Sequence, residues 1–142
     1  MNATLENTVL AESVLPPGKR KTGKILIVDD EAPVRRLIES TLRSVGYEQI
    51  IFGTSGSAVP SLALNERPDL IIMDVMMPGG NGLKALRILR HAKDTAAIPV
   101  IITTGFNVRT LEAESPERTE YVLAKPFSAP QLLQQVAAIL DA

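Results

Sequence analysis

The sequence contains no cysteine, which excludes disulfide bonds and thiolate metal sites. Its 15 lysine and arginine residues nearly balance 16 aspartate and glutamate residues, and the formal net charge is -1. Proteins that bind nucleic acid directly usually present a strongly basic surface, so we expect no such partner. No apolar run approaches the length of a membrane span, and residues 1–23 lack the apolar stretch of a signal peptide. Together these absences favour a cytoplasmic protein without membrane insertion.

The 142 residues suffice for one domain, and they divide into two regions of different composition. Residues 1–23 are polar and end in a Pro-Pro-Gly turn and a basic cluster, which predicts a flexible N-terminal extension. A weak apolar stripe in this region leaves a docking helix as the alternative; it consists of Leu5, Val9, Leu10 and Val14. Residues 24–142 carry the pattern of a folded domain.

Short apolar runs rich in isoleucine and valine alternate with amphipathic segments from Lys24 onward. Little polar and apolar alternation occurs within the runs, as expected for strands covered on both faces; they occupy residues 24–29, 49–53, 69–74, 98–104 and 120–125. The amphipathic segments have helical spacing and occupy residues 32–45, 57–66, 81–92, 107–115 and 129–140. Strands that alternate with helices predict an α/β fold with a parallel sheet.

Several residues indicate where these helices begin and end. Gly46 follows the first helical segment as a stop signal. Pro60 fits the second segment if Ser57 caps it, because proline removes no hydrogen bond from the first turn of a helix. Ser128, followed by Gln131, predicts a capping box at the start of the last helix.

Polar residues gather where the predicted strands end. Asp29 and Asp30 end the first strand, Asp74 ends the third, Thr104 ends the fourth and Lys125 ends the fifth. In open α/β sheets, ligand sites form outside the carboxyl ends of the strands, so these side chains should meet. Clustered carboxylates suit Mg²⁺, and an aspartate can also attack phosphorus to form an aspartyl phosphate. A hydroxyl and an ammonium would then hold the phosphoryl oxygens.

Each of these residues also has an ordinary structural interpretation when it is taken alone. Asp29 or Asp74 could cap a helix, Thr104 could form a turn, and Lys125 could be a solvated surface charge. Their occurrence together at successive strand ends favours the functional interpretation.

The segments that carry these residues resemble the receiver domain of two-component response regulators. The similar motifs span nearly the whole domain and read ILIVDDE (25–31), PDLIIMDVMMPGGNG (68–82), IPVIITTG (98–105) and LAKPFS (123–128). The resemblance implies a flavodoxin-like, doubly wound (βα)5 sandwich, with five parallel strands in the order 2-1-3-4-5.

The resemblance also implies a role for each polar residue at the strand ends. Asp74 would accept the phosphoryl group, Thr104 would place its hydroxyl on that group, and Lys125 would pair with it. The Lys125–Pro126 peptide would be cis, as in the family. The Mg²⁺ ligands would be Asp29 through water, Asp30, Asp74 and the main-chain carbonyl of Met76.

The implied function is Mg²⁺-dependent transfer of a phosphoryl group to Asp74 from a sensor histidine kinase or a histidine phosphotransfer protein. The phosphorylated form would change its affinity for a downstream protein in two-component or phosphorelay signalling. Such a domain is no enzyme beyond its own phosphorylation and autodephosphorylation. With no output domain after Ala142, we expect a single-domain regulator, and a receiver cut from a longer protein is the alternative.

Two other function classes fit the sequence less well. A phosphatase of the haloacid-dehalogenase type needs a second aspartate two residues after the nucleophile, where Met76 stands. A flavodoxin-like cofactor binder needs a glycine-rich phosphate loop after the first strand, where the acidic sequence DDEAPV stands.

The sequence departs from the receiver family where the signal is read out. The family often has an aromatic residue three positions before the conserved lysine; Val122 stands there, and we expect Tyr121 to face the opposite side of the strand. In the family, the residues two positions after the acceptor aspartate and two after the switch threonine flank the path of attacking water. Met76 and Phe106 stand there, and their apolar side chains predict slow hydrolysis of the phosphorylated form; the alternative is that both only cover the sheet edge.

Overall fold

The computed structural model describes residues 21–77, 82–105 and 121–141 of the chain. Five strands form one parallel sheet, in the order β2-β1-β3-β4-β5. The strands are β1 (Lys21–Val28), β2 (Tyr47–Gly53), β3 (Leu70–Asp74), β4 (Val100–Thr104) and β5 (Tyr121–Ala124). The helices among the described residues are α2 (Ala32–Ser44), α3 (Val59–Glu66), α4 (Gly82–His91), α6 (Ala129–Leu140) and the short 3-10 turn η2 (Gly56–Ala58). The predicted flavodoxin-like fold and its strand order are confirmed.

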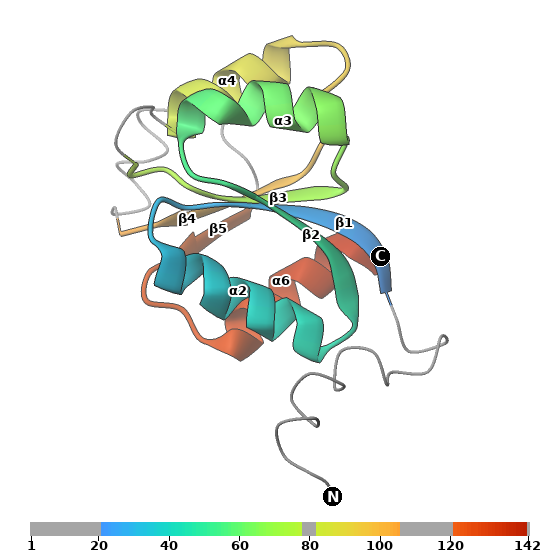
Figure 1. Ribbon diagram of the computed structural model, residues 1–142, viewed down its shortest axis with the longest axis vertical. Coiled ribbons are helices and arrows are strands. Elements are labelled where there is room, and N and C mark those ends of the chain that lie inside the picture. Colours follow the sequence, from blue (N-terminus) through green and yellow to red (C-terminus); the bar gives the residue numbers. More distant parts are fainter. Residues whose placement is uncertain (1–20, 78–81, 106–120, 142) are drawn as a thin grey trace, which may run out of the picture.

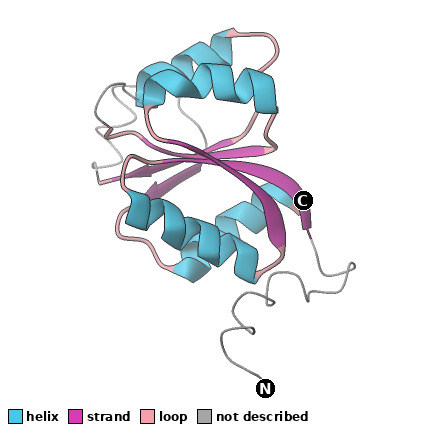
Figure 2. Ribbon diagram, in the orientation of Figure 1, coloured by secondary structure: helices cyan, strands magenta, loops and turns pink. Residues whose placement is uncertain are grey.

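Helices cover both faces of the sheet. Figure 1 shows α3 and α4 on one face and α2 and α6 on the other, and Figure 2 shows the same three layers by secondary structure. Every residue of β3 and β4 is buried, because these central strands have neighbours on both sides and helices on both faces. Successive side chains of a strand therefore enter two separate apolar cores, such as Ile71 on the α3/α4 side and Ile72 on the α2/α6 side.

The first strand begins earlier than the sequence predicts, at Lys21 instead of Lys24. The main-chain N–H of Lys21 donates to the carbonyl of Gly46 at 2.9 Å, and its ammonium lies 3.4 Å from Asp141. These partners lie far from Lys21 in the sequence, and the first residues of the strand are polar. The pattern of apolar residues therefore does not indicate the true start of the strand. Residues 1–20 lie outside the described part of the chain, and the division into an extension and a domain stays a prediction.

Two of the predicted helix signals are confirmed. Gly46 follows α2 with a φ of 108°, a left-handed conformation that glycine adopts at low cost. At α6, the main-chain N–H of Gln131 donates to the Ser128 hydroxyl while the Gln131 side chain accepts from the main-chain N–H of Ser128, which completes the capping box.

The start of the second predicted helix is partly wrong. Pro60 lies in the first turn of α3, as expected, but Ser57 does not cap this helix. Ser57 instead lies within η2, and its hydroxyl pairs with that of Ser55 at 3.1 Å. The extra turn moves the start of α3 to Val59. The predicted helix over residues 107–115 lies outside the described residues.

Candidate functional site

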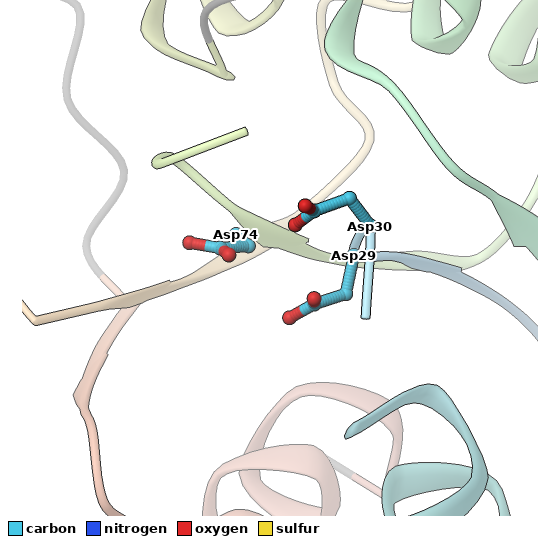
Figure 3. Close-up of side chains that lie close together, drawn as sticks. All are labelled: Asp29, Asp30 and Asp74. Carbon is cyan, nitrogen blue, oxygen red and sulfur yellow. The ribbon is translucent and has the colours of Figure 1, made fainter. Parts of the chain in front are cut away.

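Three aspartates meet at the carboxyl edge of the sheet. Asp29 and Asp30 follow the last residue of β1, and Asp74 is the last residue of β3. One carboxylate oxygen from each of the three residues lies within 4.8 Å of the other two, and Figure 3 shows the three side chains close together at the two strand ends. The parallel pairing of β1 with β3 places these strand ends side by side. The sheet thus brings together the acids that the sequence places at separate strand ends.

Asp29 forms a hydrogen bond through its main-chain N–H, its carbonyl and both of its carboxylate oxygens. Its main-chain N–H donates to the carbonyl of Gly53 at 3.2 Å, and its own carbonyl accepts from the Arg35 guanidinium at 2.7 Å. One carboxylate oxygen accepts the main-chain N–H of Glu31 at 2.9 Å, and the other accepts the Lys125 ammonium at 3.2 Å. With 1% of its surface exposed, Asp29 is a buried charge whose cost is offset by these hydrogen bonds.

Asp74 is also buried, at 4% exposure, and its two carboxylate oxygens have different partners. Oδ1 accepts the main-chain N–H of Met76 at 2.9 Å, and Oδ2 accepts the Lys125 ammonium at 3.1 Å. These contacts fix the orientation of the carboxylate at the end of β3. Met76 itself is 54% exposed.

Gly82, the first residue of α4, lets this helix pack directly against the end of β3. A Cβ atom at this position would lie 2.7 Å from the Cα of Val75 and 2.8 Å from the carbonyl oxygen of Asp74. This role of Gly82 was not predicted from the sequence. The available signal was a glycine at the start of the predicted helix over residues 81–92, because close backbone approach is a common reason for glycine at such a position.

Lys125 directly follows β5, and its ammonium bridges the buried carboxylates of Asp29 and Asp74. Burial alone would lower the pKa of its ammonium, but the hydrogen bonds and charges of Asp74 and Asp29 outweigh burial and raise that pKa. The ammonium therefore stays charged at neutral pH. The Lys125–Pro126 peptide is cis, as the resemblance implied.

Thr104 ends β4 beside the same cluster. It is fully buried, and its carbonyl accepts the main-chain N–H of Lys125 at 2.8 Å. In the same sheet, Val122 packs into the α3/α4 core and Tyr121 into the α2/α6 core, so the two side chains lie on opposite faces as predicted. Phe106 lies outside the described residues.

The charges of this cluster fit a divalent cation. Three carboxylates and the Lys125 ammonium leave these four side chains with a net charge of about -2 at neutral pH. Oxygen ligands within mutual reach and an uncompensated negative charge are what Mg²⁺ binding requires. Asp29, Asp30 and Asp74 are the side chains that could hold it.

Residues 25–137 match the response regulator receiver domain family. The chain belongs to this family. The phosphate regulon transcriptional regulatory protein PhoB of Klebsiella pneumoniae is 35% identical to this chain over an alignment of 123 residues, and the match covers 82% of this chain and 51% of PhoB. The protein PilH of Pseudomonas aeruginosa is 35% identical over an alignment of 118 residues, and the match covers 82% of this chain and 97% of PilH. The chain thus spans about half the length of PhoB.

Solved receiver structures share the fold. A response regulator of Chloroflexus aurantiacus superposes with a TM-score of 0.77 and 30% identity, over 86% of this chain and 100% of the other. The receiver domain of the sensor histidine kinase PA1611 from Pseudomonas aeruginosa superposes with a TM-score of 0.75 and 28% identity, over 84% and 98%. A magnesium ion is coordinated in the active site cleft of that PA1611 domain.

The chain therefore carries a receiver domain of the two-component signalling type. Among its described residues, no helix is both long enough and apolar enough to cross a membrane.

Proposed function

We propose that Asp74 accepts a phosphoryl group in a Mg²⁺-dependent reaction. The observation that carries this proposal is the buried Asp74 carboxylate, which lies at a strand end with two further aspartates and a bridging lysine. The donor would be a phosphohistidine of a sensor histidine kinase or a histidine phosphotransfer protein. One Asp74 oxygen forms a bond to phosphorus, the phosphorus–nitrogen bond breaks, and the histidine nitrogen keeps the electron pair and takes a proton from solvent.

Each neighbouring residue contributes to this transfer by position and charge. Lys125 holds the Asp74 carboxylate in place before transfer and provides a fixed cation for a phosphoryl oxygen afterwards. Thr104 ends β4, which pairs with β3, and would offer its hydroxyl to a second phosphoryl oxygen. Asp29, Asp30, Asp74 and the carbonyl of Met76 would hold Mg²⁺, which when bound would neutralise charge on the carboxylates and the phosphoryl oxygens.

The output is a change of affinity for a downstream protein. Phosphorylation replaces the Asp74 carboxylate with a larger dianionic group, which must displace the present ion pair of Lys125 with Asp74. The main-chain N–H of Lys125 donates to the carbonyl of Thr104, and β4 pairs with β5. A rearrangement of Lys125 and Thr104 can therefore be transmitted along these two strands to the protein surface. The domain would carry out only its own phosphorylation and autodephosphorylation.

The test is labelling with a small phosphodonor such as acetyl phosphate, followed by intact mass or by a phosphate-retarding gel. The native protein should be labelled with Mg²⁺ and not with a chelator, and Asp74→Asn should abolish labelling while the circular dichroism spectrum stays native. Asp94→Asn is the matched control, because Asp94 is exposed in the turn after α4 and lies outside the acidic cluster. Labelled Asp74→Asn protein, or labelling that survives chelation, contradicts the assignment.

A further inference from the structure

Arg35 extends from the first turns of α2 to the acidic edge of the sheet, where it contacts the main chain instead of a carboxylate. Its Nη1 donates to the carbonyl oxygen of Asp29 at 2.7 Å. This distance is typical of a strong, charge-assisted hydrogen bond. The guanidinium is partly buried, and α2 holds its stem because the main-chain N–H of Arg35 donates to the carbonyl of Glu31.

The carbonyl that Arg35 contacts belongs to the peptide that joins Asp29 to Asp30. The hydrogen bond therefore restrains the ψ angle of Asp29, and a change of that angle alone would move the carbonyl oxygen and the Asp30 side chain together relative to β1. Asp29 is also fixed by Gly53 and Lys125, whereas the exposed Asp30 carboxylate accepts no hydrogen bond from the described residues. The orientation of Asp30 therefore depends on the main chain that precedes it.

We propose that Arg35 is a positioning residue for Mg²⁺: it locks the Asp29–Asp30 peptide so that the Asp30 carboxylate points into the acidic cluster before the cation arrives. This inference rests on the proposed function of the cluster. Preorganised ligands bind more tightly because the ordering cost has already been met by the fold. A residue that hydrogen-bonds to the main chain of a metal ligand can thus change the metal affinity without contacting the metal.

The charge of Arg35 predicts the opposite effect, which makes the inference easy to test. A guanidinium near three carboxylates repels a divalent cation, so removal of the charge alone would tighten Mg²⁺ binding. Loss of positioning would weaken the binding. The sign of the change therefore separates the two roles.

The experiment measures Mg²⁺ affinity by calorimetric titration of the native chain, Arg35→Met, Arg35→Lys and the control Arg36→Met. Arg36 is the neighbouring arginine, exposed on the same helix. We expect Arg35→Met to bind Mg²⁺ about tenfold or more weakly, the usual size for loss of an outer-shell partner. Arg35→Lys keeps the charge and a less rigid donor, so its affinity should fall between those of the native chain and Arg35→Met. Arg36→Met should match the native chain.

A second readout separates positioning from a general structural defect. The initial rate of acetyl phosphate labelling should need about tenfold more Mg²⁺ for half-saturation in Arg35→Met, while the rate at saturating Mg²⁺ stays near the native value. Thermal unfolding in a chelator shows whether each variant folds. If Arg35→Met does not fold, the Mg²⁺ affinities of Arg35→Lys and Arg35→Gln are compared with that of the native chain instead.

The outcomes are distinct. Equal or tighter Mg²⁺ binding by the Arg35 variants, with a native chain that binds Mg²⁺ and is labelled on Asp74, overturns the role of Arg35 alone. A fall in affinity of the same size in Arg36→Met also overturns it, because the effect would then not depend on the Asp29 carbonyl. A native chain that does not bind Mg²⁺ overturns both this inference and the proposed function.

Discussion

Replacement of Lys125 by methionine tests how strongly the acidic cluster depends on the ammonium that bridges Asp29 and Asp74. The Lys125 ammonium lies 3.1 Å from an Asp74 oxygen and 3.2 Å from an Asp29 oxygen, and both carboxylates are buried. Removing one partner of a buried ion pair costs roughly 3–5 kcal/mol, because the remaining charge stays buried without its partner. The Lys125 side chain is 26% exposed, so solvent screens part of the interaction. We therefore expect Lys125→Met to lower the free energy of unfolding by about 2 kcal/mol in the absence of divalent cations.

Mg²⁺ should reverse this loss. A ligand present at 100 times its dissociation constant stabilises the folded state by about 2.7 kcal/mol. The variant keeps all three aspartates but lacks the competing ammonium, so Mg²⁺ should stabilise it more than it stabilises the native chain. Urea unfolding followed by circular dichroism, with a chelator and then with saturating Mg²⁺, measures both effects. The same variant should also lose the change in partner affinity on phosphorylation, because the phosphoryl oxygen lacks its fixed cation.

Lys93→Met is the control for the loss of a lysine charge, because Lys93 is exposed in the turn after α4. Its stability should stay within about 0.5 kcal/mol of the native value under both conditions. The reasoning is refuted if Lys125→Met is as stable as the native chain in the chelator. It is equally refuted if Mg²⁺ stabilises the variant less than the native chain.

Two further predictions concern parts of the fold outside the ion pair. Gly82→Ala should lower stability by about 1–3 kcal/mol in thermal unfolding, because the added methyl group would overlap the backbone after β3; Gly105→Ala, where a Cβ meets nothing within 4 Å, is the control, and equal losses would contradict the packing argument. Burial, and then the charge and hydrogen bond of Asp141, raise the pKa of Tyr47 to about 12, above the value near 10 that is expected for an unfolded chain. The neutral phenol is therefore favoured by folding, and its stabilisation is present below pH 10 and lost as the pH rises toward 12. Tyrosinate absorbance in a Tyr121→Phe background should report this raised pKa, and Asp141→Asn should lower it; an unchanged midpoint in that variant would exclude Asp141 as a cause.

The sequence by itself determined the fold class and the membership of the acidic site. Short isoleucine and valine runs without alternation, separated by amphipathic segments, favour strands covered on both faces, so the pattern predicted a parallel α/β sheet. Parallel strands share one carboxyl edge, and this geometry brings Asp29, Asp30 and Asp74 together once their strands are recognised. The capping box at Ser128 was equally readable, because its two hydrogen bonds join residues close in the chain.

The tertiary structure alone decided how these groups contact one another. Lys125 bridges Asp29 and Asp74 across separations of 96 and 51 residues, and no local pattern specifies which oxygen accepts the ammonium. The start of β1 at Lys21 likewise depends on a hydrogen bond to Gly46.

The bond from Arg35 to the Asp29 carbonyl shows the same limit over a much shorter separation. The residue types did not predict this hydrogen bond, because it depends on how α2 packs against the sheet and on the orientation of the peptide between Asp29 and Asp30. Local sequence specifies which elements form, since their hydrogen bonds and apolar periodicity are short-range. Contacts between elements depend on packing, which is determined only when the whole chain has folded.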